Sequence, residues 1–336
     1  MIKSMKLVCL IGAVTVVITF VLFAPSTFRT ETDIHNKVYV IEATIAYKST
    51  VLHEDSRETV TAGYGFTLQK VQVYNETRIL YAHLYPHSSC QQFHLMTMYF
   101  NMGRQKQYRK ISAKQLEERN RELLEVLQSN LNHPCVRKVH LFYINKEDLQ
   151  IVMTANLTNR EKLHPVQQES LIRMADYLIY ASKTLIKKPA IALNGDIVLG
   201  EGLDLIDTRK MLEEKLVYSL TRYEGNLSCS ARRHMCINNY PGSHDTHIFV
   251  LKEALNESFI KEKLNYPINM NQAENGLIYT MRYLLGFNVT NPCKSVYTYH
   301  HHCSKVHGGW EDTYSIYKLG WNSTQILLGE AKPGHL

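Results

Sequence analysis

The pattern of hydrophobic and polar positions divides the chain into three parts. Residues 7–23, LVCLIGAVTVVITFVLF, form a run of 17 without a charge. Residues 25 to about 88 alternate apolar and polar positions in short stretches such as KVYVIEATIAY and ETRILYAHLY, a pattern typical of strands. From about residue 90, compact apolar runs alternate with longer amphipathic segments. This third part is where we expect a layered domain.

The third part predicts alternating strands and helices. Short apolar runs predict strands at 93–100, 136–144, 190–199, 217–224 and 246–251. Helical periodicity predicts helices at 112–131, with Ser112 as N-cap, at about 167–187 and at about 272–285. This order is typical of a parallel sheet with crossover helices. The predicted fold class is therefore α/β, with a mixed, mainly parallel sheet flanked by helices.

The uncharged run predicts a membrane anchor. Seventeen helical residues reach roughly 25 Å, the short end of a membrane span. Lys3 and Lys6 precede the run, which places the amino end in the cytosol and the rest in the lumen. A cleaved signal peptide is the competing interpretation, although Leu22 and Phe23 fit its cleavage site poorly. The expected parts are a cytoplasmic tail (1–6), a transmembrane signal anchor (7–24), a stem with a β-rich lead-in (25–88) and a lumenal domain (89–336).

Glycosylation signals and cysteines agree with the lumen. The Asn-x-Ser/Thr acceptors are Asn75, Asn156, Asn226, Asn256, Asn288 and Asn322. The cysteines beyond the anchor are Cys90, Cys135, Cys229, Cys236, Cys293 and Cys303, an even number that suits an oxidising compartment. Short loops close most easily. First guesses among the open pairings are therefore Cys229–Cys236 and Cys293–Cys303, which leaves Cys90 for Cys135.

Composition and charge narrow the function classes. The chain has 336 residues, of which 45% are hydrophobic and 21% charged, so disorder, collagen and multi-span membrane architectures are excluded. A net charge of +7 without long basic runs suits acidic ligands. No nucleic-acid-binding motif is present, and we expect no nucleic-acid partner.

A carboxylate and a histidine run are candidate metal ligands. Asp196 ends a predicted strand after the small Gly195, which suits a divalent cation and a diphosphate. The alternative is a turn aspartate that caps its own backbone. His300 and His302 share one face of an extended segment and could converge on an ion, although a polar surface run has the same appearance. We expect Asp196 to face the surface and to contribute little to the core.

Two further acidic residues are candidates for chemistry. Asp245 precedes a predicted strand, and Glu274 begins a predicted helix. Glu274 could take a proton from an acceptor hydroxyl, or it could simply cap the helix. The chain has no GxSxG, GxGxxG or Walker loop, so covalent hydrolases and nucleotide hydrolases have no support. It also has no HExxH, which makes a zinc hydrolase a weak alternative.

The order of the motifs is more specific than any one of them. Over about 93–304 the chain contains MTMYF, ERNRELLEVLQSNL, VHLFYI, ALNGDIVL, SLTRYE, SHDTHIF, ENGLIYTMRYLLG and NP followed by YHHH. This order resembles nucleotide-sugar-dependent glycosyltransferases of GT-A fold, in particular a group with the motifs NxDI, LxRxE, SxDxWIF, a CDN-like helix start and NPxxxxxYHxH. The resemblance implies a GT-A-like, Rossmann-like catalytic domain over 89–336.

The resemblance also implies site roles. It places Asp196 on metal and diphosphate, and His300 or His302 on the same metal. The residues implied for the donor pocket are Asn194, Asp196, Arg222 and Glu224. Asp245 would hold the sugar, and Glu274 would lie on the acceptor side. The departures from the motifs are His247 for the usual tryptophan, Ala273-Glu274 for Cys-Asp, and Asn194 for the first acidic residue.

Together these features predict a single-pass type II Golgi glycosyltransferase. The implied cofactor is Mn²⁺ or Mg²⁺, and the co-substrate is a nucleotide-sugar donor. The expected partners are this donor, a glycan or glycoprotein acceptor and a membrane through residues 7–24, with assembly into a homodimer left open. Two alternatives remain, namely a catalytically inactive lumenal binding domain on the same fold and a secreted metal-dependent hydrolase.

Overall fold

The computed structural model describes residues 45–51, 60–66, 90–100, 111–224, 236–237, 244–304 and 315–336. The strands are β1 Ile45–Val51, β2 Val60–Phe66, β3 Phe93–Met98, β4 Val136–Tyr143, β5 Leu163–Gln167, β6 Pro189–Leu193, β7 Ile197–Leu199, β8 Leu216–Leu220, β9 Tyr223–Glu224, β10 Thr246–Val250, β11 Asn288–Thr290 and β12 Thr298–His300. The helices are α1 Ala113–Asn132, α2 Lys146–Thr154, α3 Met174–Thr184, α4 Thr208–Glu213, α5 Glu257–Leu264, α6 Ala273–Tyr279 and α7 Ser323–Leu328.

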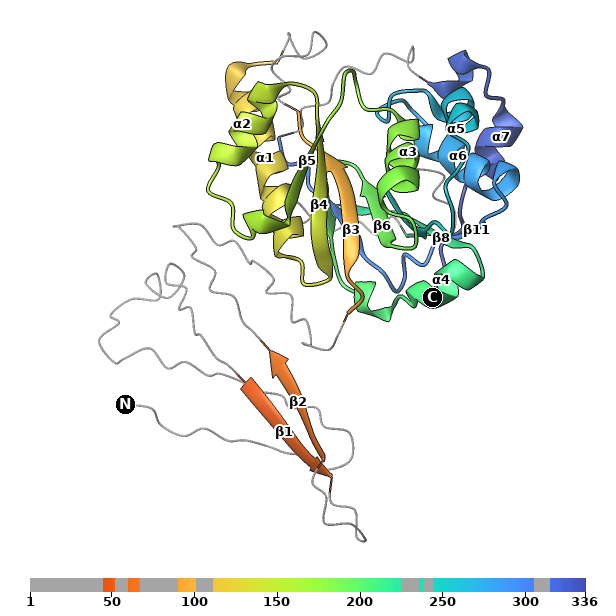
Figure 1. Cartoon of the computed structure of the whole chain (residues 1–336). Helices are drawn as coiled ribbons and strands as arrows, with labels where there is room; N and C mark the ends of the chain where they lie inside the picture. Colours follow the sequence, from red (N-terminus) through yellow and green to blue (C-terminus); the bar gives the residue numbers. More distant parts are fainter. Residues whose placement is uncertain are drawn as a thin grey trace.

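A seven-stranded sheet in the order β11-β8-β10-β6-β3-β4-β5 forms the centre of the domain (Figure 1). All neighbouring pairs are parallel except those of β10, which runs antiparallel to both β6 and β8. The predicted α/β class with a mainly parallel sheet is therefore confirmed. A smaller sheet, β7-β12-β9, adjoins it. The strands β1 and β2, in the predicted lead-in, pair antiparallel with each other.

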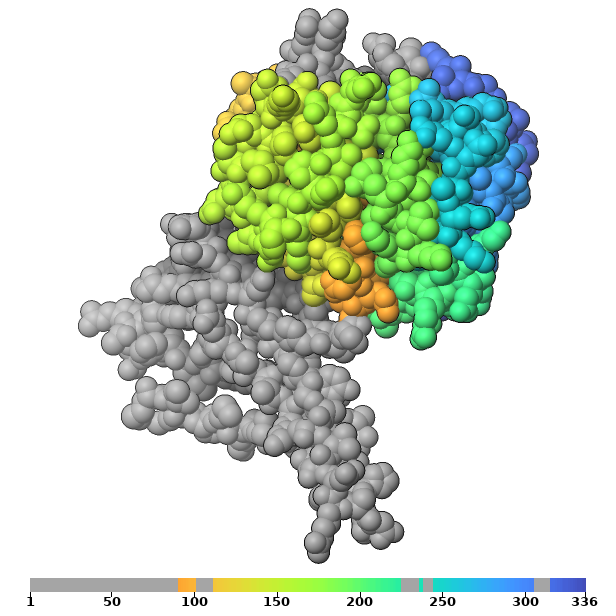
Figure 2. Space-filling model, viewed as in Figure 1, coloured from red at the N-terminus to blue at the C-terminus, as the bar shows by residue number. Residues whose placement is uncertain are grey.

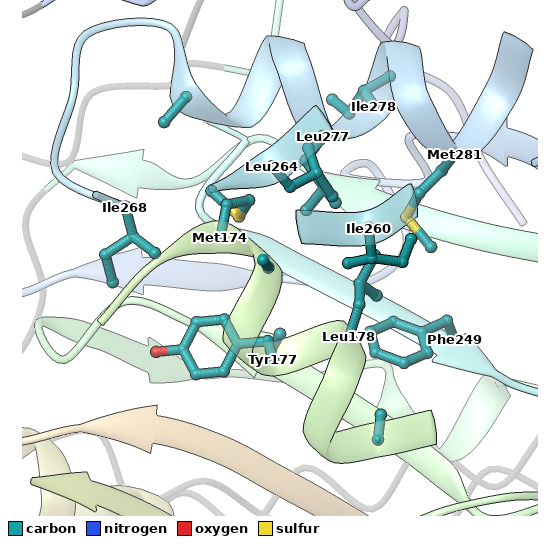
Figure 3. Close-up of a cluster of buried hydrophobic side chains, with 14 of the residues drawn as sticks. Met174, Tyr177, Leu178, Phe249, Ile260, Leu264, Ile268, Leu277, Ile278 and Met281 are labelled. Carbon is teal, nitrogen blue, oxygen red and sulfur yellow. The ribbon is translucent and has the colours of Figure 1, made fainter. Parts of the chain in front are cut away.

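Side chains of the central strands point alternately to the two faces of the sheet, and each face packs in its own hydrophobic core. Leu95, Val139 and Ile191 pack with Leu123 and Leu127 of α1 in one cluster. The opposite face packs against α3, α5 and α6, whose apolar side chains converge in the cluster drawn in Figure 3. The space-filling view shows the α1–α3 part of the chain and the α5–α7 part side by side on one surface (Figure 2).

The predicted helix starts are partly confirmed. Ser112 is the N-cap of α1, where its hydroxyl accepts from the Gln115 amide and the Gln115 side chain closes a capping box. The predicted helix at 272–285 is α6 followed by a π-helical segment, Thr280–Leu284. The helix predicted at about 167–187 begins later, as α3. The chain before it forms the edge strand β5, whose mostly exposed, proline-containing sequence LHPVQ carries no apolar alternation.

Two of the three guessed disulfides are wrong. Cys90 pairs with Cys135 as expected, but Cys236 pairs with Cys293, which excludes both Cys229–Cys236 and Cys293–Cys303. Cys303 is also disulfide-bonded, and Cys229 lies outside the described residues. The short-loop argument fails because packing, not loop length, decides the pairing. Cys236 and Cys293 share a buried cluster with Tyr223, whose hydroxyl donates to the Cys293 carbonyl at 2.9 Å.

The expected anchor, residues 7–24, lies outside the described residues. No helix within the described part of the chain has the length and apolar character needed to cross a membrane. Four of the predicted glycan acceptors are described and exposed: Asn156, Asn256, Asn288 and Asn322. Asn75 and Asn226 lie outside the described residues.

Candidate functional site

Because β10 runs antiparallel to its neighbours, its first residue lies at the same edge of the sheet as the last residues of β6 and β8. Its first residue, Thr246, lies opposite Leu193 at the end of β6 and Leu220 at the end of β8. The segments after β6 and β8 and the segment before β10 therefore meet. Parallel sheets bind ligands at this carboxyl edge. The strand β12 joins the same edge, since His300 pairs with Ile197 and Glu224.

Asn194, Arg222 and Asp245 form the first part of a polar network at this edge. The Asn194 amide donates to Asp245 Oδ1 at 2.8 Å, and Arg222 Nη1 donates to Asp245 Oδ2 at 2.9 Å. Arg222 Nε donates to Glu224 Oε1 at 2.8 Å. The guanidinium thus holds in fixed positions the carboxylate of Glu224 in β9 and that of Asp245, which directly precedes β10.

His300 extends the network, because its two ring nitrogens each contact a carboxylate, one of Glu224 and one of Asp196. Its Nδ1 lies 2.8 Å from Glu224 Oε2, and its Nε2 lies 3.1 Å from Asp196 Oδ2. Burial alone would lower the pKa of His300, but Asp196 and Glu224 outweigh it and raise the pKa to about 9. Burial likewise opposes ionisation of Asp196, yet His300 and Arg119 hold its pKa well below the usual range. The ring is accordingly an imidazolium between carboxylates.

Arg119 of α1 is a site residue that the sequence interpretation missed. Its Nη2 lies 2.5 Å from Asp196 Oδ2, and its Nη1 donates to Glu122 Oε2 and to the His301 carbonyl, both at 3.0 Å. The Arg119 side chain is only 3% exposed, and that of Asp196 is 20% exposed. The expectation that Asp196 faces the surface and matters little for the core is therefore wrong, because Asp196 neutralises a buried cation.

Residues of α1 also hold the segment that follows His300. Glu122 Oε1 accepts from the backbone amides of Cys303, at 2.9 Å, and Ser304, at 2.5 Å. Glu125 Oε2 lies 3.0 Å from Nε2 of the fully buried His301. We call Arg119, Glu122 and Glu125 the α1 clamp. The clamp fixes the backbone that carries His300 and His302.

Glu274 lies in the first turn of α6 and joins the other end of the network. Its carboxylate has a hydrogen bond with Asn194, and burial followed by the nearby Asp245 charge raises the pKa of Glu274 to about 8. Arg222 acts in the opposite direction but does not cancel the shift. A helix start normally favours the carboxylate form. Here desolvation and like charge prevail, so Glu274 can both hold and release a proton near neutral pH.

Asp196, His300 and His302 are arranged as metal ligands could be. One ligand atom from each lies within 4.8 Å of the others. One carboxylate and two imidazoles suit a divalent transition metal such as Mn²⁺ better than Mg²⁺, which prefers oxygen ligands. His300 would bind such a metal as the neutral imidazole, so the metal would have to displace one of its ring protons. Gly195, directly before Asp196, is required by packing, because a Cβ there would lie 2.6 Å from the Met98 carbonyl oxygen.

The structure brings together all the residues that the sequence placed in the site. They are Asn194, Asp196, Arg222, Glu224, Asp245, Glu274, His300 and His302. His247, the departure from tryptophan, makes its hydrogen bond outside this network. It is buried in the sheet, where its Nδ1 lies 3.0 Å from the Ser219 hydroxyl, and burial lowers its pKa to about 3.

No protein-family model and no curated protein matches the chain. Among solved structures, a glucose-1-phosphate thymidylyltransferase from Bacillus anthracis in complex with sucrose is 9% identical, with 62% of this chain and 88% of that chain covered at a TM-score of 0.35. HddC from Yersinia pseudotuberculosis is 14% identical, with 68% and 100% covered at a TM-score of 0.29. At these values the similarity is limited to chain arrangement, and no function is transferred from it.

Proposed function

We propose that this chain is a nucleotide-sugar-dependent glycosyltransferase with a GT-A-like domain at residues 89–336. One observation carries the proposal: residues picked from five separate sequence motifs join in one hydrogen-bonded network at the ligand-binding edge of the sheet. The motif order alone predicted this meeting. Turn caps and a polar surface run, the ordinary alternatives, would have left these residues apart.

The donor diphosphate is assigned to the Asp196 side of the network. Asp196, His300 and His302 would hold a divalent metal, which when bound neutralises charge on the departing diphosphate. Asn194, Arg222 and Glu224 would line the donor pocket. Arg222 is a positioning residue, because its guanidinium donates to both Glu224 and Asp245. Its role is to orient these carboxylates toward the sugar.

The acceptor is assigned to the Glu274 side. In the reaction, the acceptor oxygen forms a bond to the anomeric carbon while the bond from that carbon to the phosphate oxygen breaks. The electron pair leaves with the nucleoside diphosphate, and the hydroxyl proton passes to the Glu274 carboxylate. Asp245 contacts sugar hydroxyls beside it. A base with a pKa of about 8 is matched to this proton transfer near neutral pH.

A Golgi membrane location, with a type II anchor at residues 7–24, belongs to the same proposal. Its supports are the uncharged run after Lys3 and Lys6, the exposed glycan acceptors and the disulfide bonds. Glycan or glycoprotein acceptors are present in that lumen. A donor made in the cytosol would have to be delivered there.

The deciding experiment is a donor panel. The full-length protein, purified in detergent, is incubated with individual UDP- and GDP-sugars and Mn²⁺, and released nucleoside diphosphate is measured with and without glycan acceptors. We expect release with one donor, increased by an acceptor. Binding of a donor without release across the whole panel would favour the inactive binding domain. Metal-dependent cleavage of glycans without any donor would favour the hydrolase.

A further inference from the structure

A second polar region lies at the opposite edge of the central sheet, where the parallel strands begin. A pocket of about 650 Å³ there is lined by Cys90, Gln91, Gln92, His94, Arg137, Lys138, Lys187, Lys188 and Pro189. We call it the basic pocket. Pro189 opens β6, whose other end leads to Asn194 and the candidate site. Five strand residues place the two regions roughly 17 Å apart.

The basic pocket concentrates positive charge without a balancing acid. Its lining includes four cations, Arg137, Lys138, Lys187 and Lys188, and no Asp or Glu among the described residues. Within the described part of the chain none of the four has an ion pair, and Lys188 Nζ donates only to the Thr184 carbonyl at 3.2 Å. A structural role, capping the end of α3, explains why a lysine is present at position 188. No such contact among the described residues explains the cations Arg137, Lys138 and Lys187. Uncompensated cations around a concave surface favour anion binding.

His94, a neutral imidazole, lines the basic pocket together with the four cations. It is 9% exposed and lies between the small Ala190 and Lys138 in the strand register. Burial, then Lys188, Arg137 and Lys138, lower the pKa of His94 to about 4, so the ring is neutral at ordinary pH. Lys188, Arg137 and Lys138 are therefore all close enough to act electrostatically on the His94 ring.

A buried relay fixes the His94 ring. Its Nδ1 lies 2.9 Å from His140 Nε2, and His140 Nδ1 lies 2.7 Å from the Tyr180 hydroxyl. This leaves Nε2 as the His94 nitrogen available to a ligand. If Tyr180 donates to His140 and His140 donates to His94, the His94 proton is on Nε2, where it can be donated to an oxyanion.

The backbone supports a functional use of this edge. Lys187 has a left-handed φ of 57°, a conformation that non-glycine residues seldom adopt. Its amide donates to the Leu251 carbonyl at 2.8 Å, which holds the turn between α3 and β6. A lysine at a position where glycine would cost less is consistent with a need for its side chain.

We propose that the basic pocket binds a small molecule carrying a phosphate or sulfate group, with the four cations around the oxyanion and His94 as a hydrogen-bond donor. The pocket volume exceeds that of a bare oxyanion and lies in the range of about 300–1,000 Å³ usual for small-molecule sites. The proposal stands apart from the glycosyltransferase assignment, because the pocket shares no residue with the candidate site.

Titration calorimetry on the full-length protein in detergent with EDTA tests the proposal. The probes are inorganic sulfate, glucose 6-phosphate and glucose 6-sulfate, with glucose as the neutral control, and they distinguish a phosphate from a sulfate source. The test variant is Arg137→Gln/Lys187→Gln. The matched control, Lys146→Gln/Lys318→Gln, removes the same charge at exposed positions outside the pocket.

We expect the wild type to bind at least one charged probe and not glucose. The dissociation constant should rise at least tenfold in the test variant, since one charge-assisted contact is worth about a factor of ten, and should change less than about twofold in the control. No binding of any charged probe, or equal losses in both double variants, would overturn the proposal.

A second measurement does not depend on a folded variant. Lysine acylation of the wild type, mapped by mass spectrometry, should slow at Lys187 when the bound probe is present and stay unchanged at Lys146. Equal rates at Lys187 with and without the probe would contradict the assignment.

Discussion

Glu274 is the proposed general base, and its environment raises the pKa of its carboxyl group. Its raised pKa of about 8 reflects burial and the charge of Asp245, against Arg222; Tyr266 also lies within electrostatic reach. As a general base it must be deprotonated, so kcat/KM should rise with pH through about 8 and then level off. In Glu274→Gln, turnover should fall by ~10²–10⁴ with donor binding nearly intact, and the rise with pH should disappear.

Stability gives the same prediction an independent readout. The folded-state pKa of Glu274 lies above its ordinary value of 4.5, so the folded protein binds the proton more tightly than the unfolded chain. Its contribution to stability is therefore fully present below about pH 4.5 and is lost as the pH rises to about 8. Glu274→Gln should flatten this decline, whereas the exposed Glu213→Gln should not. A variant with altered stability but unchanged turnover would reduce Glu274 to a structural residue.

Asp196 is expected to matter for both rate and stability. Asp196→Asn should lower transfer by ~10²–10³ by removing a charged group from the diphosphate side. It should also lower the free energy of unfolding by about 1–3 kcal/mol, because the buried Arg119 loses one of its two carboxylate partners. Chemical denaturation and donor turnover measure the two effects. The exposed Asp204→Asn is the control, and full activity of Asp196→Asn would remove Asp196 from the site.

At the scale of elements, the α1 clamp explains how a helix far away in sequence supports the site. Glu122→Gln removes the charge that Arg119 and the Ser304 hydroxyl contact, and it weakens acceptance from the Cys303 and Ser304 amides. We expect a loss of about 1–3 kcal/mol in stability. We also expect faster hydrogen exchange at residues 301–304, measured by mass spectrometry. Glu117→Gln, exposed on the same helix, should change neither; unchanged exchange in Glu122→Gln would contradict the clamp.

The elements show what a sequence pattern can and cannot predict. Strong apolar runs located β3, β4 and β10, and the Ser112 cap located the start of α1. The strands predicted at 190–199 and 217–224 are each divided in two, as β6 and β7 and as β8 and β9, which lie in different sheets. The edge strand β5 was missed because its partner β4, not its own pattern, makes it a strand. Arg119 did leave a signal. It lies three residues after Leu116 and four before Leu123, so a charge falls on the apolar face of the helix.

At the scale of the whole molecule, the order of motifs predicted the membership of the site, but distant contacts decided its details. The clamp joins residues about 180 positions apart, and no local pattern encodes that contact. The Cys236–Cys293 bond has the same origin. Loop length describes the unfolded chain, whereas the bond reflects where packing leaves the two thiols.

The proposed membrane anchoring and glycosylation of the whole protein can be tested without a donor. Carbonate washing should leave the protein in the membrane pellet, and endoglycosidase should lower its apparent mass. Asn256 and Asn322 also cap α5 and α7 through their side-chain oxygens, so Ser258→Ala and Thr324→Ala are the informative variants. Each should remove one glycan while its cap remains. Release into the wash, or an unchanged mass after the enzyme, would contradict the assigned topology.

The position of β12 late in the chain separates two events during synthesis. The last strand of the central sheet, β11, ends at Thr290, whereas His300 and His302 follow only after it. The helix α1, which clamps the residues around them, lies in the first half of the chain and is made long before them. At ~5–20 residues per second, the Arg119–Glu122 pair would be made roughly ten to forty seconds before the 301–304 backbone that it holds. A ribosome-bound chain therefore carries the Arg119–Glu122 pair before the backbone amides and the carbonyl that complete its hydrogen bonds have been made.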